Sequence, residues 1–146
     1  MSNWTANDIP DQTGKIVVIT GANSGLGYET ALALARKNAH VVMTSRSIEK
    51  GEKARAEILK QVPNAQVDVM RLDLANLASI REFVEAFNNR CDRLDQLYNN
   101  AGVMALPKSK TADGFEMQFG TNHLGHFALT SLLLPKLLTT PNSRVV

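Results

Sequence analysis

The sequence predicts an α/β fold in which helices cover both faces of a doubly wound parallel sheet. Residues 16–19, Ile-Val-Val-Ile, form an unbroken β-branched run, as expected of a strand that is buried on both faces. A glycine-rich turn and an Ala- and Leu-rich segment at residues 28–37 follow it, and that segment reads as a helix. Strand-like and helix-like segments then alternate along the chain, which favours parallel strands joined by crossover helices.

The remaining elements follow in order. Strands are expected at residues 39–45, 66–72, 94–98 and 143–146, and helices at residues 48–61, 76–89 and 113–138. In the helix at 76–89, Leu77, Ile80, Val84 and Phe87 recur at three- and four-residue steps, so one face is buried. The helix at 113–138 is apolar on more than one side and needs a cover. Right-handed crossovers give the strand order 3-2-1-4, with the start of a fifth strand beside the fourth.

Length and composition suit a single domain. We expect a loosely held N-terminal arm at residues 1–13 and one domain at residues 14–146 of the 146-residue chain. The net charge of +2, with scattered basic residues, gives no case for nucleic-acid binding. Cys91 is the only cysteine, which fits a reducing compartment, and no apolar run is long enough to span a bilayer. The sequence therefore predicts a cytoplasmic location.

The turn after the first strand has the chemistry of a phosphate site. Gly21 permits a tight turn, Gly25 lets a diphosphate approach the main chain, and Gly27 lets the helix lie close to the sheet. Backbone N–H groups and the positive helix end would face the phosphates. The other turn residues expected to contribute are Asn23, Ser24 and Leu26. The alternative is an ordinary strand-to-helix loop.

Two motifs resemble one family. Residues 20–27, Thr-Gly-Ala-Asn-Ser-Gly-Leu-Gly, and residues 99–102, Asn-Asn-Ala-Gly, are similar to the fingerprint of the short-chain dehydrogenase/reductase family. The wording of the first motif and Asn-His-Leu-Gly-His-Phe at residues 122–127 resemble its retinol-dehydrogenase-like branch. The resemblance implies a Rossmann-like dinucleotide-binding fold and an oxidoreductase that interconverts an alcohol and a carbonyl, with an apolar substrate. Both motifs fall at the predicted crevice between strands 1 and 4.

The end of the second strand indicates which dinucleotide binds. An NAD site usually has an acid here that binds the ribose hydroxyls, whereas NADP needs a cation. Ser45 stands at the acid's position, and Arg46 offers a planar fork for a 2′-phosphate. The sequence therefore predicts NADP rather than NAD. The alternative is that Arg46 is a solvated surface residue.

The resemblance also implies the rest of the cofactor site. The side chain of Asp73 and the backbone of Leu74 would hold the adenine, although Asp73 also suits the N-cap of the helix that begins near residue 76. The segment Asn100, Ala101 and Gly102 would pass close to the nicotinamide ribose.

Asn122 is the candidate catalytic residue within this sequence. Gly120 and Gly125 flank it, and these poor helix formers predict a local irregularity. By resemblance, Asn122 holds a water that relays protons to a catalytic Lys; the alternative is an Asn that satisfies a kinked backbone. His123 and His126 have no acidic or thiol ligand near them in sequence, so no metal site is predicted.

The family's remaining catalytic groups are a Ser and a Tyr followed four positions later by Lys, which lie after the fifth strand. Tyr28 and Tyr98 are the only tyrosines, and neither has that Lys. We therefore expect the N-terminal, cofactor-binding half of a longer chain, inactive alone or completed by another chain, and a homo-oligomer formed through the helix at 113–138. The alternatives are a non-catalytic NADP-binding module that senses redox state or scaffolds a partner, and a nucleotide-sugar epimerase, which Asn-Asn-Ala-Gly disfavours.

Overall fold

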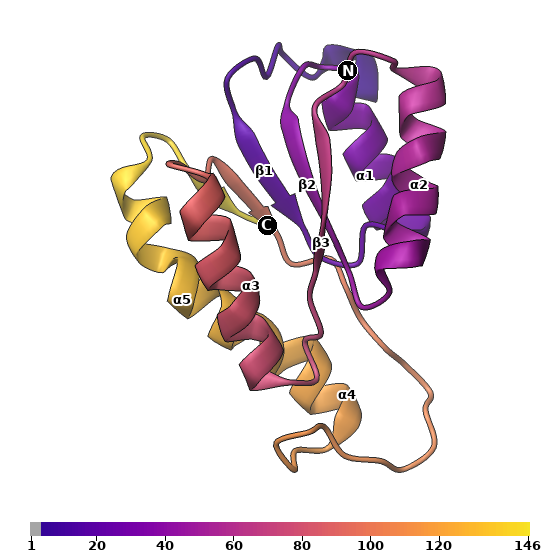
Figure 1. The fold of residues 1–146 in the computed structure, drawn as a ribbon, viewed down its shortest axis with the longest axis vertical. Helices are drawn as coiled ribbons and strands as arrows, with labels where there is room; N and C mark the ends of the chain where they lie inside the picture. Colours follow the sequence, from indigo (N-terminus) through magenta and orange to yellow (C-terminus); the bar gives the residue numbers. More distant parts are fainter. Residues whose placement is uncertain (1–3) are drawn as a thin grey trace.

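The computed structural model describes residues 4–146 and contains a five-stranded parallel sheet in the order β3-β2-β1-β4-β5 (Figure 1). The strands are β1 (Ile16–Ile19), β2 (His40–Ser45), β3 (Val67–Arg71), β4 (Gln96–Tyr98) and β5 (Arg144–Val145). The central strand is β1, where Val18 lies opposite Val42 on one side and Leu97 on the other. The predicted fold class and strand order are confirmed.

Helices cover both faces of the sheet, as expected for a doubly wound fold. On one face lie α1 (Gly25–Ala35) and α2 (Ile48–Gln61), and on the other lie α3 (Leu77–Arg90) and α5 (His126–Thr139) (Figure 1). The shorter helical segments are the 3-10 turn η1 (Ala6–Asp8), α4 (Met117–Phe119) and the π-helical η2 (Gly120–Gly125).

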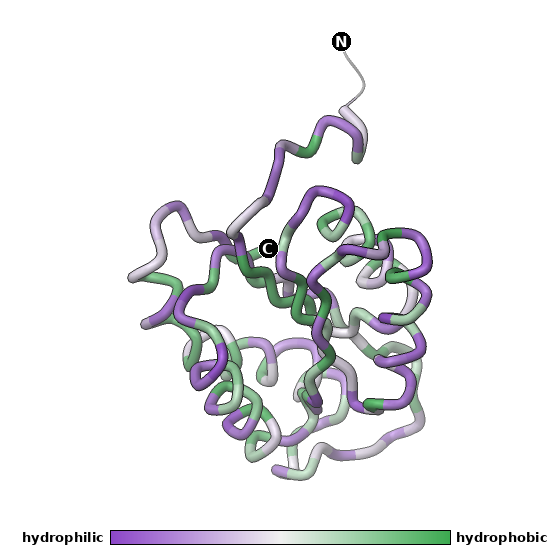
Figure 2. Tube along the Cα trace, turned by 45° about the horizontal axis from the view of Figure 1, so that its top comes forward, coloured by the Kyte–Doolittle hydropathy of each residue, from purple (hydrophilic) through white to green (hydrophobic). Residues whose placement is uncertain are grey.

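Alternation along β1 divides the core in two. Val18 packs with the residues of α3 and α5, whereas Val17 and Ile19 pack with those of α1 and α2. The hydropathy colouring shows the strands as the apolar centre of the molecule (Figure 2). The small residues Gly27, Ala31 and Ala35 recur every four positions on α1 and are buried, and this small face lets α1 pack closely on the sheet, as predicted for Gly27.

The C-terminal helical region differs from the prediction of one helix over residues 113–138. Gly114 has a φ of +85°, which belongs to a turn, and the Glu116 carboxylate caps α4 by accepting the N–H groups of Gln118 and Phe119. The helix therefore begins at Met117. The irregularity predicted around residue 122 is the π-helical segment η2, and α5 continues from it.

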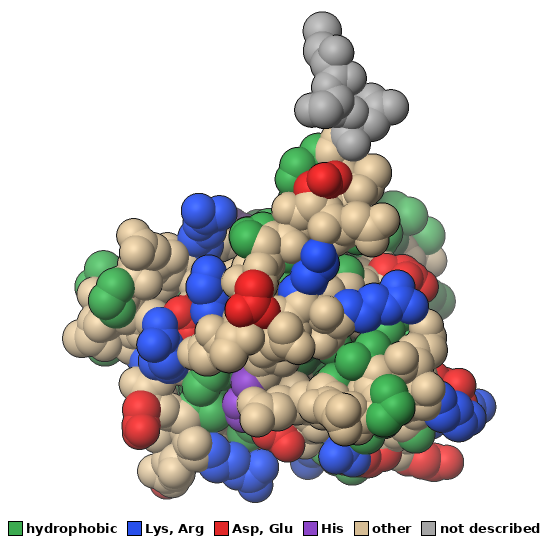
Figure 3. Space-filling view, turned by 90° about the horizontal axis from the view of Figure 1, so that it is seen from above, with side chains coloured by type: hydrophobic (Ala, Val, Ile, Leu, Met, Phe, Trp, Pro, Cys, Tyr) green, Lys and Arg blue, Asp and Glu red, His purple; other side chains and the backbone are tan. Residues whose placement is uncertain are grey.

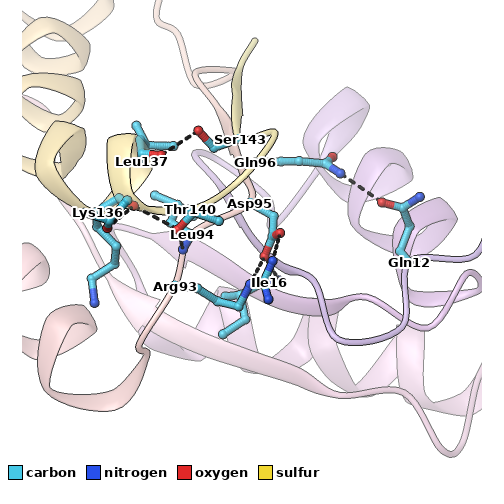
Figure 4. Close-up of polar contacts among 11 residues, drawn as sticks. Gln12, Ile16, Arg93, Leu94, Asp95, Gln96, Lys136, Leu137, Thr140 and Ser143 are labelled. Atoms are coloured by element: carbon cyan, nitrogen blue, oxygen red, sulfur yellow. Dashed lines mark hydrogen bonds and ion pairs between the residues drawn. The ribbon is translucent and has the colours of Figure 1, made fainter.

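The N-terminal arm contacts the sheet through Gln12, while most of its other described residues are exposed. Gln12 is only 3% exposed, and its Oε1 accepts a hydrogen bond of 2.9 Å from Gln96 Nε2 (Figure 4). The Tyr98 hydroxyl donates to Gln96 Oε1 at 2.7 Å, and Gln12 Nε2 donates to the Pro10 carbonyl at 2.8 Å. These contacts extend from β4 into the arm. Residues 1–3 lie outside the described residues.

Polar contacts also close the amino end of the sheet. Asp95 is 4% exposed and accepts two hydrogen bonds from Arg93, at 2.9 and 2.6 Å, and one of 2.9 Å from the Ile16 N–H (Figure 4). Nearby, the Thr140 hydroxyl at the end of α5 accepts the Leu94 N–H at 3.2 Å. The starts of β1 and β4 and the end of α5 are thus held together.

The surface at this amino end carries charges of both signs, interspersed rather than gathered into one patch (Figure 3). Among residues 4–146, no helix combines the length and the apolar character that crossing a bilayer requires.

Candidate cofactor site

A cavity of about 420 Å³ opens at the carboxyl ends of the strands. The segments that follow β1, β2, β3 and β4 all contribute to its wall. Its lining consists of Gly21, Asn23, Ser24, Leu26, Thr44, Ser45, Arg46, Leu72, Leu74, Asn100, Ala101, Gly102, Val103 and Thr121. Most of the residues predicted to bind a cofactor therefore surround one cavity, whereas Gly25, Gly27, Asp73 and Asn122 are not in its lining.

Glycine is favoured at each of the three turn positions for a different structural reason. Gly21 has a φ of +64°, and a Cβ there would lie 2.9 Å from the Ala101 Cβ. A Cβ on Gly27 would lie 2.5 Å from the Gly21 carbonyl oxygen and 2.6 Å from Asn100 Nδ2. Gly25 has a φ of +57° and no neighbour within 4 Å of such a Cβ. Two glycines thus allow protein packing, while the third leaves open space beside the main chain.

The N-terminus of α1 has no internal cap. Ser24 occupies the N-cap position but makes no side-chain cap hydrogen bond, whereas Ser47 and Asn76 cap α2 and α3. Among residues 4–146, no acceptor bonds the N–H groups of Gly25 and Leu26. Free N–H groups at a helix start attract anions, so this end of the cavity suits the pyrophosphate of a dinucleotide.

The end of β2 supplies the one charge that the described residues bring to the cavity lining. The buried Ser45 hydroxyl donates to Asn23 Oδ1 at 3.2 Å and accepts the Ser47 N–H at 3.3 Å, which ties the β2 end to the glycine turn. Arg46 is exposed, lies in the cavity wall and forms no ion pair within residues 4–146. Within the described part of the chain, no carboxylate lines the cavity. Its electrostatics therefore favour a ligand with an additional anionic group.

The loop after β3 corrects one alternative. Asp73 does not cap α3: the N-cap is Asn76, whose Oδ1 accepts the N–H groups of Ala78 and Ser79. Asp73 Oδ1 instead accepts the Ala75 N–H at 2.9 Å and shapes the loop that brings Leu74 into the cavity wall. The predicted adenine contact of Asp73 stays a prediction.

Thr20 organises the floor of the cavity, and the sequence reasoning did not single it out. Its Oγ1 accepts the N–H groups of Asn100 and Ala101, each at 2.9 Å, and its carbonyl accepts Asn100 Nδ2 at 2.9 Å. Thr20 therefore joins the two motifs that the sequence predicted to meet. Its position directly before the first glycine of the turn was the available signal.

Asn122 lies behind the cavity wall. Its amide pairs with the Val103 backbone through two hydrogen bonds of 2.8 Å, one to the N–H and one to the carbonyl. The exposed His123 stacks on Phe119, with ring centroids 5.2 Å apart, whereas His126 is buried. In the part of the chain that the structure describes, no three His, Cys, Asp or Glu side chains gather closely enough to hold a metal ion.

The sheet, the uncapped helix start and the shared crevice define a Rossmann-type nucleotide-binding protein. Residues 15–146 match the family model of short chain dehydrogenases, and the chain belongs to that family, whose members bind a nicotinamide cofactor. The family predicted from the two motifs is thereby confirmed.

Similar proteins and solved structures agree with this family assignment. Retinol dehydrogenase 12 of Mus musculus is 54% identical over 133 residues, which are 91% of this chain and 42% of that protein. The crystal structure of an uncharacterized protein from Mycobacterium Paratuberculosis is 51% identical, with a TM-score of 0.82 over 92% of this chain and 47% of that one. A short chain dehydrogenase from Shigella flexneri 2a, complexed with NADP, is 25% identical, with a TM-score of 0.78 over 92% of this chain and 58% of that one.

The sequence thus spans about two fifths of the length of the retinol dehydrogenase that it matches. These similarities confirm the retinol-dehydrogenase-like branch and the correspondence to the N-terminal, cofactor-binding half of the family fold.

Proposed function

We propose that the protein is an NADP-dependent oxidoreductase that interconverts an alcohol and a carbonyl, with an apolar substrate. The observation that carries the choice of NADP is that, among residues 4–146, Arg46 is the only charged side chain in the cavity wall. A 2′-phosphate needs such a cation, whereas the ribose hydroxyls of NAD are usually bound by a carboxylate. The complex of the Shigella flexneri short chain dehydrogenase with NADP supports the same choice.

The residues present fit the cofactor along the length of the cavity. The free N–H groups at the start of α1 would bind the pyrophosphate, and Arg46 the 2′-phosphate. Leu74 would face the adenine, with Asp73 Oδ2 available for a polar contact, since no hydrogen bond within residues 4–146 uses that oxygen. Asn100 to Gly102 would lie along the nicotinamide ribose. The bound NADPH would supply the hydride that reduces the carbonyl.

We also propose the catalytic role for Asn122, which is to hold a water for proton relay. Its amide oxygen and amide nitrogen already bind Val103, and its backbone carbonyl accepts His126 Nδ1, so the second lone pair of that carbonyl is the acceptor left to hold such a water. Retinol in the name of the relatives supports an apolar alcohol or aldehyde as substrate. No observation favours a module that binds NADP without catalysis.

The test is a titration of NADPH and NADH against the Arg46→Ala variant, followed by nucleotide fluorescence. We expect NADPH to bind about 10- to 100-fold more weakly, because a charge-assisted contact to the phosphate contributes roughly 1.5–3 kcal/mol. NADH binding should change little. Arg81→Ala, which removes an exposed arginine on α3, is the matched control. An unchanged NADPH affinity in Arg46→Ala would refute the NADP assignment.

A second variant tests the neighbouring position. Ser45→Asp introduces the carboxylate that NAD sites carry, close to where the 2′-phosphate would lie. We expect this substitution to weaken NADPH and to strengthen NADH, because the new charge repels the phosphate and can accept the ribose hydroxyls. If the ratio of the two affinities does not move toward NADH, the end of β2 does not select the nucleotide.

Homo-oligomerisation is proposed through the outward face of α5. Phe127 is 66% exposed and Leu138 76% exposed, with Leu134 between them on the same side of the helix. Large apolar side chains exposed along one side of a helix, here with the polar Ser131 between Phe127 and Leu134, favour a protein cover, for which we propose a second copy of the chain. Sedimentation of Phe127→Glu beside the unmodified protein tests it: an unchanged molecular mass would refute it. The cytoplasmic location stays a prediction.

A further inference from the structure

A buried histidine that does not line the cavity is hydrogen-bonded to the floor of the proposed cofactor site. His126 is 7% exposed, and its ring makes two polar contacts. Nε2 lies 2.9 Å from Thr20 Oγ1, at the end of β1, and Nδ1 lies 2.9 Å from the Asn122 carbonyl oxygen, in η2. The ring thus joins the strand that leads into the glycine turn to the π-helical segment.

The contacts fix the direction of these hydrogen bonds. A carbonyl oxygen only accepts, so Nδ1 carries the proton that bonds Asn122. Burial lowers the pKa of His126, and this favours the neutral ring, although the hydrogen bond to Asn122 acts in the opposite direction. In the neutral ring Nε2 is an acceptor, and at 2.9 Å it receives the proton of the Thr20 hydroxyl. The Tyr98 carbonyl, the other acceptor near that hydroxyl, is farther away at 3.2 Å and already accepts the Thr20 N–H.

This arrangement matches donors and acceptors at Thr20. Once the hydroxyl proton points to His126, the two lone pairs of Oγ1 are left for the N–H groups of Asn100 and Ala101, each at 2.9 Å. A donor at Nε2 would instead put three N–H groups against two lone pairs. The acceptor on His126 therefore keeps Thr20 available for the Asn-Asn-Ala-Gly backbone.

The π-helical segment supplies the acceptor on the other side of the ring. The backbone N–H of His126 bonds the His123 carbonyl rather than that of Asn122, the i−4 partner of a regular α-helix. The Asn122 carbonyl can then receive the histidine ring. The segment also contacts the cavity wall directly, because a Cβ on Gly125 would lie 2.3 Å from the Leu74 carbonyl oxygen.

We propose that His126 is a positioning residue for cofactor binding: by holding the Thr20 hydroxyl, it fixes the Asn100–Ala101 backbone that forms the wall beside the nicotinamide ribose. It is not among the residues that line the cavity, so its effect on a bound cofactor would pass through Thr20. This inference rests on the proposed function. Its consequence is that NADPH affinity depends on a nitrogen acceptor at residue 126.

The test compares three variants of the purified protein by NADPH titration. His126→Asn is too short to reach Thr20 but can still donate to the Asn122 carbonyl, whereas His126→Gln carries an acceptor amide at about the reach of Nε2. We expect the dissociation constant to rise about tenfold in His126→Asn and to stay within about threefold of the unmodified protein in His126→Gln. The control is His123→Gln, on the exposed side of the same segment, which should leave the affinity unchanged.

A double-mutant cycle identifies the route. Thr20→Val removes the hydroxyl, so adding His126→Asn to it should weaken NADPH binding by no more than about twofold further. If the two effects multiply instead, His126 does not act through Thr20. If His126→Asn alone binds NADPH as tightly as the unmodified protein, the inference fails while the proposed function stands. If the unmodified protein does not bind NADPH, the proposed function itself fails.

Unfolding midpoints are measured for every variant, so that lost affinity is separated from lost folding. Should His126→Asn show no cooperative unfolding transition, His126→Phe replaces it, because this ring has a similar shape and no acceptor. The same tenfold loss and the same non-additivity with Thr20→Val are expected. A loss of affinity in His126→Gln as large as that in His126→Phe would overturn the inference, because the acceptor would then be irrelevant.

Discussion

The glycine turn offers a sharp test, because its second and third glycines should fail in different ways when alanine replaces them. Gly27 is enclosed by protein atoms, whereas Gly25 faces open space. The substitution Gly27→Ala should therefore damage the fold, and Gly25→Ala should damage cofactor binding. The two residues are two positions apart at the start of one helix, so each variant is the control for the other.

The magnitudes follow from the surroundings. A Cβ on Gly27 meets the Gly21 carbonyl oxygen at 2.5 Å and Asn100 Nδ2 at 2.6 Å, and overpacking of this kind costs about 1–3 kcal/mol. Alanine returns roughly 0.5–1 kcal/mol through its better helix propensity. The net loss of about 1–2 kcal/mol lowers the melting temperature by roughly 3–8 °C in a chain of this size.

For Gly25 the balance is reversed. The φ of +57° costs an alanine about 1–2 kcal/mol in the folded protein, but within residues 4–146 the new Cβ meets no atom within 4 Å beyond its chain neighbours and its own helix backbone. If a pyrophosphate approaches the main chain here, the methyl group occupies its space. We therefore expect NADPH affinity to fall at least tenfold in Gly25→Ala.

Thermal unfolding and NADPH titration are measured on both variants, with affinities taken well below each melting temperature. The reasoning is refuted if Gly27→Ala melts at the temperature of the unmodified protein, or if Gly25→Ala keeps full affinity for NADPH. The first result would mean that α1 can move away from the sheet without cost. The second would mean that the phosphates do not bind at the turn.

Two further predictions concern stability. Asp95→Ala leaves the Ile16 N–H and Arg93 without their acceptor, and it should lower the free energy of unfolding, measured in urea, by about 2–3 kcal/mol. The control is Asp92→Ala, at an exposed neighbouring position, which should change this free energy by less than about 0.5 kcal/mol. Similar losses in the two variants would contradict the role given to Asp95. Burial lowers the pKa of folded His126 below its ordinary 6.5, so the unfolded state takes up the proton first and stability should fall as the pH drops through about 6.5. His126→Gln should lose this part of the pH dependence, and identical pH profiles for the two proteins would refute it.

Much of the fold could be predicted because its signals are local. The β-branched run of β1 and the four-residue spacing of small residues on α1 describe faces that must be buried, and the structure buries them. Alternation of strands and helices, with right-handed crossovers, then leaves few strand orders, and the observed order is the predicted one.

Boundaries and caps were harder to predict because several neighbouring residues have the same chemistry. Asp73 and Asn76 are both suited to an N-cap, and only the backbone path decides that Asn76 performs it. Likewise, Phe115 fits the apolar spacing of the residues that follow it, and this spacing extended the predicted helix back to residue 113. The positive φ of Gly114 and the cap made by Glu116 nevertheless delay the helix to Met117.

The candidate site likewise has a part that the sequence predicts and a part that it does not. The segments that line the cavity are contiguous motifs after consecutive strands, so topology alone brings them together. The contact between Thr20 and His126 joins residues 106 positions apart. Periodicity assigns His126 only to a helix, and the sequence contains no signal for which strand end its ring meets.

Tertiary contacts explain why the π-helical segment Gly120–Gly125 can persist although it departs from the favoured α-helical pairing. A Cβ on Gly120 would lie 2.4 Å from Thr111 Cγ2, and one on Gly125 would lie 2.3 Å from the Leu74 carbonyl oxygen, so both ends of the segment pack where only glycine fits. Between them, the Asn122 side chain binds the Val103 backbone and its carbonyl receives the His126 ring. These tertiary contacts replace regular helical hydrogen bonds, and those with Leu74 and Val103 reach residues of the cavity wall. A regular α-helix through the same residues would return the Asn122 carbonyl to its i+4 amide and leave Nδ1 of the buried His126 without that partner.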